Sequence, residues 1–122
     1  MTNPTYFQAL DYERMVREYP IGDDFAAMMK SISRDELQAL QEKRLLKLID
    51  RGWEIPFYKR LWSAAGMASG DIKRLEDSAK IPSYSKADLM KSIEEYPPFG
   101  DFHGMETYDK DKRPPVVFHT TS

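Results

Sequence analysis

The residues best placed for chemistry lie at the end of the chain, where an apolar run leads into hydroxyl side chains. Residues 116–119 (Val-Val-Phe-His) are continuously apolar up to the histidine, which is typical of a strand covered on both faces. Thr121 and Ser122 follow almost at once. In α/β folds, a buried strand that delivers hydroxyl side chains to its carboxyl edge is where a phosphate-binding loop begins. Such a loop needs glycines, so that backbone N–H groups can approach the phosphate oxygens, and none follows here.

The other residues capable of chemistry form no catalytic or metal-binding pattern. His103 and His119 lie in different contexts and lack the spacing of metal ligands, so we expect both to be structural. The absence of Cys excludes a disulfide framework and a thiolate nucleophile within these residues. Neither a nucleophile elbow nor an HExxH motif is present. From spacing alone we predict no catalytic residue and no metal site in this chain.

Composition limits the class of protein further. The length of 122 residues is that of one domain, and 18 basic and 20 acidic residues are mixed along it. The sequence therefore has no basic face that would indicate binding to nucleic acid. No apolar run approaches the roughly 18 residues that span a bilayer, and the first residues lack the basic and apolar regions of a secretory signal. We expect a cytoplasmic protein that binds neither nucleic acid nor membrane.

The elements that must position these residues are organised around a helix predicted for residues 33–51. Ser33 is a good N-cap, and Glu36 completes the capping-box pattern. Gly52 is predicted to end the helix in a left-handed conformation, and Pro56 stops any continuation. At about 100° per residue, the apolar side chains fall on one broad face: Leu37, Leu40, Leu45, Leu48 and Ile49.

Two polar residues, Gln41 and Arg44, fall on the same apolar face, and their position has two interpretations. In the first, they lie at the edge of a wide stripe and their stems cover apolar surface, as long polar side chains usually do. In the second, both are buried and paired, and they hold the helix against another part of the protein.

Shorter elements are predicted on either side of this helix. The spacing of Phe25, Met28, Met29 and Ile32 predicts an amphipathic helix. A second helix is expected to begin at Pro56 and end before Gly66, and a third to be capped by Ser83 or Ser85. Residues 101–115 are predicted to be a loop. The strand at 116–119 has no partner strand in the sequence, so the chain is expected to be part of something larger.

The chain carries an ordered set of short motifs, each of them weak alone. They are residues 33–37 (Ser-Arg-Asp-Glu-Leu), 40–41 (Leu-Gln), 44–45 (Arg-Leu), 56–58 (Pro-Phe-Tyr), 71–72 (Asp-Ile), 75–77 (Leu-Glu-Asp), 81–82 (Ile-Pro), 86–89 (Lys-Ala-Asp-Leu), 96–97 (Tyr-Pro) and 99–100 (Phe-Gly). In this order and at about this spacing, they resemble the phenylacetate–CoA ligases, AMP-forming enzymes of the adenylate-forming superfamily. The resemblance covers roughly residues 33–122 and leaves the first 30 or so unplaced.

The resemblance implies a role for the end of the chain. In that family the strand ends in His-x-Ser-Ser-Gly-Thr-Thr-Gly, the loop that grips the ATP phosphates. His119, Thr121 and Ser122 match its first positions, with Thr121 in place of the first Ser, and the glycines are absent here. The implied cofactor-binding residues are therefore Thr121 and Ser122, with His119 adjacent, and the implied cofactors are ATP, Mg²⁺ and CoA.

The resemblance also implies a fold and a domain organisation. The whole enzyme would be a mixed α/β protein, of which this chain is mainly helical and ends in one buried strand that leads into the phosphate loop. Residues 1–32 would be an N-terminal extension and residues 33–100 a helical N-terminal subdomain. Residues 101–122 would be a loop and the first core strand of the large ATP-binding domain, truncated at the phosphate loop. The catalytic lysine of the family's C-terminal domain is absent, so this chain alone is predicted to be inactive.

The function implied is that of an N-terminal segment of an ATP-dependent acyl- or aryl-acid–CoA ligase, which forms acyl-AMP and then acyl-CoA. Its expected partners are the remainder of the same enzyme, a small carboxylic acid that we expect to be aromatic, and a second copy in a homodimer. The alternative is a free-standing helical module that binds a partner protein without catalysis. The unpaired strand counts against this alternative, because a complete module should not end on a buried strand.

Overall fold

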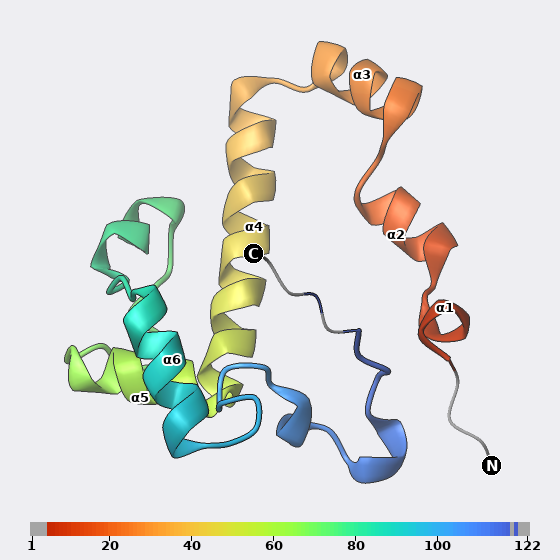
Figure 1. Ribbon diagram of the computed structural model, residues 1–122. Helices are drawn as coiled ribbons and strands as arrows, with labels where there is room; N and C mark the ends of the chain where they lie inside the picture. The colour runs from red at the N-terminus through yellow and green to blue at the C-terminus, as the bar shows by residue number, and fades with distance from the viewer. Residues whose placement is uncertain (1–4, 118, 120–122) are drawn as a thin grey trace. The chain divides into compact units, whose positions relative to one another are not determined.

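A computed structural model describes residues 5–117 and 119, and over these residues the chain is helical without any strand (Figure 1). The elements are α1 (Tyr6–Ala9), α2 (Tyr12–Glu18), α3 (Gly22–Ser31), α4 (Arg34–Glu54), α5 (Pro56–Ala64), η1 (Leu75–Lys80), α6 (Lys86–Glu95), η2 (Met105–Thr107) and η3 (Lys110–Lys112), where η marks a 3₁₀ helix. None of these helices is both long and apolar enough to cross a membrane. The prediction of a mainly helical chain is confirmed.

The chain divides into two compact units. One comprises residues 34–107, and the other comprises residues 1–33 together with 108–122. The boundaries expected at residues 32 and 100 refer to the domains of a whole ligase, and they stay a prediction.

The unit that contains residues 1–33 and 108–122 has no fully buried side chain among its described residues. Its helix α3 carries the predicted apolar spacing, and Asp11 caps α2 by accepting a hydrogen bond from the Arg14 N–H at 3.0 Å. Large apolar side chains nevertheless remain exposed; Phe7 is 72% exposed and Ile21 is 68% exposed. This unit therefore has helices without an enclosed core.

The buried strand predicted at residues 116–119 is wrong. Val116 and Val117 are 44% and 47% exposed and belong to no strand, and His119 is exposed as well. Phe118 lies outside the described residues. The physical reason is that a strand needs a neighbour for its N–H and C=O groups. No segment of the described part of the chain forms such a neighbour.

The long helix α4 begins immediately after Ser33, as predicted, and dominates the unit of residues 34–107 (Figure 1). Ile49 is its most buried apolar residue, at 7% exposure, and it packs in a cluster with three residues from outside α4. Leu48, which was expected on the same buried face, is 68% exposed. The other members of the cluster are Trp62 of α5, Met67 and Ile72.

The prediction that Gly52 ends α4 in a left-handed conformation is wrong. The helix continues to Glu54, and Gly52 has no positive φ angle. Its actual role is steric, because a Cβ at this position would lie 3.0 Å from Cζ3 of Trp62 and closer still to Cη2. Glycine therefore lets α5 approach α4 closely enough for the indole ring to lie against the α4 backbone.

The polar residues of α4 follow neither of the two interpretations completely. Gln41 is exposed and Arg44 is half-buried, so the two are not buried together. The residue that links α4 to its neighbour is Glu42, whose carboxylate accepts a hydrogen bond from the Leu75 N–H at 2.9 Å. Leu75 begins η1, which returns alongside α4 (Figure 1).

The caps of the shorter helices agree with the sequence. Pro56 occupies the first turn of α5, and Gly66 follows that helix with a φ of +80°. Of the two candidate caps for α6, Ser85 is the one used, in a capping box with Asp88. At the start of η1, the hydrogen bond with Lys80 and those from the Lys73 and Arg74 N–H groups lower the pKa of Asp77 to about 2.

We predict that Gly52→Ala destabilises the protein by about 1–3 kcal/mol, because the added methyl group overpacks against Trp62. In an exposed helix interior the same change would stabilise by about 1 kcal/mol. The measurement is the free energy of unfolding in urea. Gln38→Ala, at an exposed position of α4, is the matched control and should be neutral or slightly stabilising. A Gly52→Ala variant as stable as this control would contradict the close packing.

Candidate functional site

A pair of reciprocal hydrogen bonds joins α6 to the segment that follows it. Ser92 of α6 is 1% exposed, and its hydroxyl donates to Oδ1 of Asp101 at 2.6 Å. The same hydroxyl oxygen accepts a hydrogen bond from the Asp101 backbone N–H at 2.9 Å. The hydroxyl of the buried serine therefore has a partner both as a donor and as an acceptor, and a single residue nine positions away supplies both.

Asp101 also binds α5. Its two carboxylate oxygens each accept a hydrogen bond from Nη2 of Arg60 at 3.1 Å, and its backbone carbonyl accepts one from the Phe57 N–H at 3.2 Å. The Arg60 guanidinium lies over the Phe57 ring, 5.5 Å from the centroid, which adds a cation–π contact. An exposed ion pair alone would contribute little, but the Asp101 side chain is only 9% exposed. We call Arg60, Ser92 and Asp101 the polar node.

Gly100 is the residue that makes the node possible. It has a φ of +76°, a backbone angle that residues with a side chain rarely adopt. A Cβ on Gly100 would also lie 2.7 Å from Oγ of Ser92 and 2.7 Å from the Phe102 ring. The Phe-Gly pair at residues 99–100, one of the motifs in the family resemblance, therefore supplies the turn that aims Asp101 back at Ser92.

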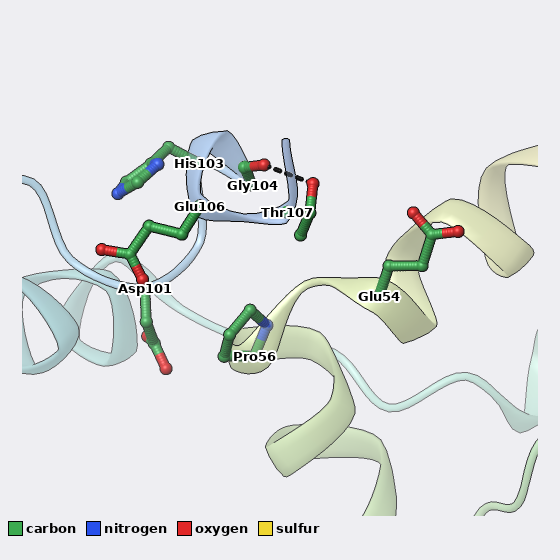
Figure 2. Close-up of a pocket in the computed structure, with 7 residues that line it drawn as sticks. All are labelled: Glu54, Pro56, Asp101, His103, Gly104, Glu106 and Thr107. Atoms are coloured by element: carbon green, nitrogen blue, oxygen red, sulfur yellow. Dashed lines mark hydrogen bonds between the residues drawn. The ribbon is translucent and has the colours of Figure 1, made fainter. Parts of the chain in front are cut away.

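A polar cavity of about 530 Å³ lies beside the node (Figure 2). Figure 2 shows His103, Gly104, Glu106 and Thr107 on the turn around η2, with Glu54 projecting from the end of α4. The cavity is lined by Glu54, Pro56, Asp101, His103, Gly104, Glu106 and Thr107.

Most polar groups around this cavity already bind one another. Arg51 pairs with Glu54 at 2.8 Å and donates to the Gly104 carbonyl at 3.2 Å. The Thr107 hydroxyl donates to the same carbonyl at 2.7 Å. His103 Nδ1 accepts the Met105 N–H at 3.0 Å, which in the neutral imidazole leaves Nε2 protonated.

The cavity does not contain a catalytic constellation. Its imidazole contacts neither a nucleophile nor a carboxylate in any hydrogen bond that the structure shows. No group of three His, Asp or Glu side chains that could hold a metal ion occurs within residues 5–117 and 119. The arrangement can hold a turn in place and accept hydrogen bonds from a ligand.

The site residues predicted from the sequence are placed only in part. His119 is exposed and belongs to the unit of residues 1–33 and 108–122, whereas His103 belongs to residues 34–107. Thr121 and Ser122 lie outside the described residues, so their role in binding phosphate stays a prediction. Sequence reasoning missed the polar node. Its one signal was Gly100, directly before an acidic residue.

No protein-family model matches the chain. Over 75 residues, however, it is 39% identical to the phenylacetate-coenzyme A ligase of Thermus thermophilus, a match that covers 61% of this chain and 16% of that protein. Over 62 residues it is 40% identical to the phenylacetate-coenzyme A ligase of Escherichia coli, covering 50% of this chain and 14% of the relative. Over this stretch the chain is similar to the phenylacetate–CoA ligases. The resemblance of its ordered motifs to these ligases is thereby confirmed.

Solved structures agree with this relationship. The chain matches a 2-hydroxyisobutyryl-CoA ligase in its postadenylation state, in complex with 2-HIB-AMP, with a TM-score of 0.55 and 36% identity over 58% of this chain. A structure of that ligase with 2-HIB-AMP and CoA in the thioesterification state gives the same TM-score and identity. The match spans about one-sixth of the length of these CoA ligases, 15–16%.

We predict that Ser92→Ala destabilises the protein by about 1–3 kcal/mol, because the Asp101 N–H and carboxylate both lose a buried partner. Thermal or urea unfolding of the purified variant measures the loss. Ser63→Ala, on the exposed surface of α5, is the matched control and should change the free energy of unfolding by less than about 0.5 kcal/mol. Equal stability of the two variants would show that the node does not stabilise the fold.

Proposed function

We infer that this chain is an N-terminal segment of an AMP-forming ligase that joins a carboxylic acid to CoA. The observation that carries this inference is the identity of 37–40% to three phenylacetate-coenzyme A ligases. The match to a CoA ligase solved with an acyl-AMP and with CoA supports it. Because the match spans 14–16% of these relatives, the activity is proposed for a whole enzyme that contains this segment.

The proposed reaction has two steps. A carboxylate oxygen of the acid attacks the α-phosphorus of ATP, the bond from that phosphorus to the bridging oxygen breaks, and pyrophosphate leaves. The CoA sulfur then attacks the acyl carbon, and AMP leaves with the electron pair of the C–O bond while the thiol loses its proton. Stabilisation of the phosphate charge by fixed N–H and O–H donors is the main requirement of the first step.

Within this chain, we assign the phosphate donors to Thr121 and Ser122, with His119 adjacent to them. Support comes from their match to the start of the family's phosphate loop. The described residues offer no cluster of three acidic or imidazole side chains, so they do not fit a Mg²⁺ site by themselves. Any Mg²⁺ would accompany the ATP, and we assign no step to it.

Residues 34–107 are assigned a positioning role. The polar node fixes the segment from Gly100 onward against α5 and α6, and the phosphate-binding residues lie downstream of that segment in the chain. In the proposed enzyme, residues 1–32 are an extension, residues 33–100 a helical subdomain, and residues 101–122 the entry to the large ATP-binding domain. We further propose a cytoplasmic homodimer that acts on a small, aromatic acid.

A second function, that of a free-standing helical module, is favoured by one observation. Residues 1–33 expose large apolar side chains, of which Phe7 and Ile21 are the most accessible. A partner protein could cover them. The same exposure is expected of a segment that packs against the rest of a larger enzyme, so the sequence identity decides for the ligase.

We predict that this segment can replace its counterpart in a working ligase. In the test, the matching segment of the Thermus thermophilus enzyme is exchanged for the corresponding residues of this chain. We expect the chimera to catalyse ATP–pyrophosphate exchange that depends on an added acid, within about tenfold of the parent rate, a loss of about 1.4 kcal/mol in barrier. The 122-residue chain alone should show none, because it lacks the later parts of the site.

Phenylacetate and 2-hydroxyisobutyrate would be compared as acids, one aromatic and one aliphatic. Exchange by the 122-residue chain alone would contradict its assignment as a segment. A soluble, cooperatively folding chimera without exchange would contradict the proposed function.

A further inference from the structure

An apolar groove of about 400 Å³ lies on α4 and α5 within the unit of residues 34–107. Its floor is made by Ile49 and Trp62, which are 7% and 5% exposed. Leu48 also lines the groove and is 68% exposed, although it lies on α4, the longest helix of the described residues. Phe102, next to the polar node, also lines the groove. An exposed leucine beside an open apolar hollow is a surface that another group can cover.

The groove has no unsatisfied charge to attract a polar ligand. Arg51 is its one charged lining residue, and its guanidinium binds Glu54 and the Gly104 carbonyl. The hydroxyls of Tyr58 and Tyr84 lie 3.3 Å apart and bond to each other. Burial and this hydrogen bond raise the pKa of Tyr58 to about 12, so the Tyr58 hydroxyl carries no charge at physiological pH. The groove therefore suits apolar side chains rather than a nucleic acid or a phosphate.

The unit of residues 34–107 has a small hydrophobic core. Within the described residues only five large apolar side chains are buried: Ile49, Phe57, Trp62, Met67 and Ile72. Small units bury a low fraction of their surface and gain stability when a further layer covers them. A ligase of the length of these relatives has enough further chain to form such a layer, because 84% of the Thermus thermophilus ligase lies outside its match to this chain.

We propose that the groove is an intramolecular docking face, into which apolar side chains from the remainder of the ligase pack over Leu48. This inference rests on the proposed function, because it requires that remainder to exist. A second copy of this chain is a poorer occupant. In a symmetric dimer the same patch must meet itself, and two concave grooves facing each other would leave voids. A protruding element of a different part of the enzyme fits the hollow.

The test uses the chimeric ligase described above, with the photo-cross-linker p-benzoylphenylalanine introduced at position 48. We expect a cross-link within one polypeptide, from position 48 to a peptide outside the exchanged segment, identified by mass spectrometry. The matched control carries the cross-linker at Asp50, which is exposed two residues along α4 and points about 160° away around the helix. Position 50 should give no such product.

A substitution gives a second readout that does not depend on cross-linking. Leu48→Asp should lower the melting temperature of the chimera by several degrees, because it places a carboxylate in a covered apolar groove. The same substitution in the 122-residue chain should lower the melting temperature by much less, because Leu48 is exposed there and only the lower helix propensity of Asp acts. Asp50→Leu is the control substitution and should have little effect in either protein.

The outcomes separate this inference from the function on which it rests. An active chimera that gives no cross-link from position 48 and tolerates Leu48→Asp would overturn the docking face and leave the ligase function standing. Cross-links between two polypeptides would overturn it in favour of a dimer interface. A soluble, cooperatively folding chimera that does not catalyse exchange would count against the proposed function, and the docking face would fall with it.

Discussion

The pair of hydrogen bonds between Ser92 and Asp101 is the constraint on which the unit of residues 34–107 depends. A buried serine without partners would cost about 1–3 kcal/mol, and here one acidic residue satisfies both of its groups. Once Asp101 is fixed, its carboxylate holds Arg60 and its carbonyl holds the Phe57 N–H, so α5, α6 and the intervening turn become one assembly. The polar cavity and one wall of the apolar groove follow from that placement, because both are lined by residues of this turn.

The other side of the unit is held by steric fit rather than by polarity. Gly52 leaves room for the Trp62 ring against the backbone of α4, and Glu42 ties η1 to the same helix. Helix α5 is thus fixed twice, by van der Waals contact to α4 and by hydrogen bonds to Asp101. These two kinds of contact together fix α5 within the unit of residues 34–107.

Local signals in the sequence predicted the helices well, because caps and apolar spacing act over a few residues. Ser33, Pro56 and Ser85 lie at the starts of α4, α5 and α6, as expected. The end of α4 was predicted wrongly at Gly52, because a glycine that permits close helix packing cannot be told from a C-cap glycine by sequence. The strand at 116–119 failed because strand formation depends on a partner segment. The polar node was invisible to periodicity, since it joins a helix to a turn through side chains, and Thr121 and Ser122 lie outside the described residues.

Amide hydrogen exchange in the 122-residue chain tests most directly whether the polar node governs the unit. We predict that the N–H groups of Asp101 and Phe57 exchange only with global unfolding, as slowly as that of Ile49 in the core, although Asp101 lies in an irregular segment. Exchange of the Asp101 N–H as fast as that of Asp109, in the exposed turn before η3, would contradict it. The segment after α6 would then open independently, and the node could not be what positions it.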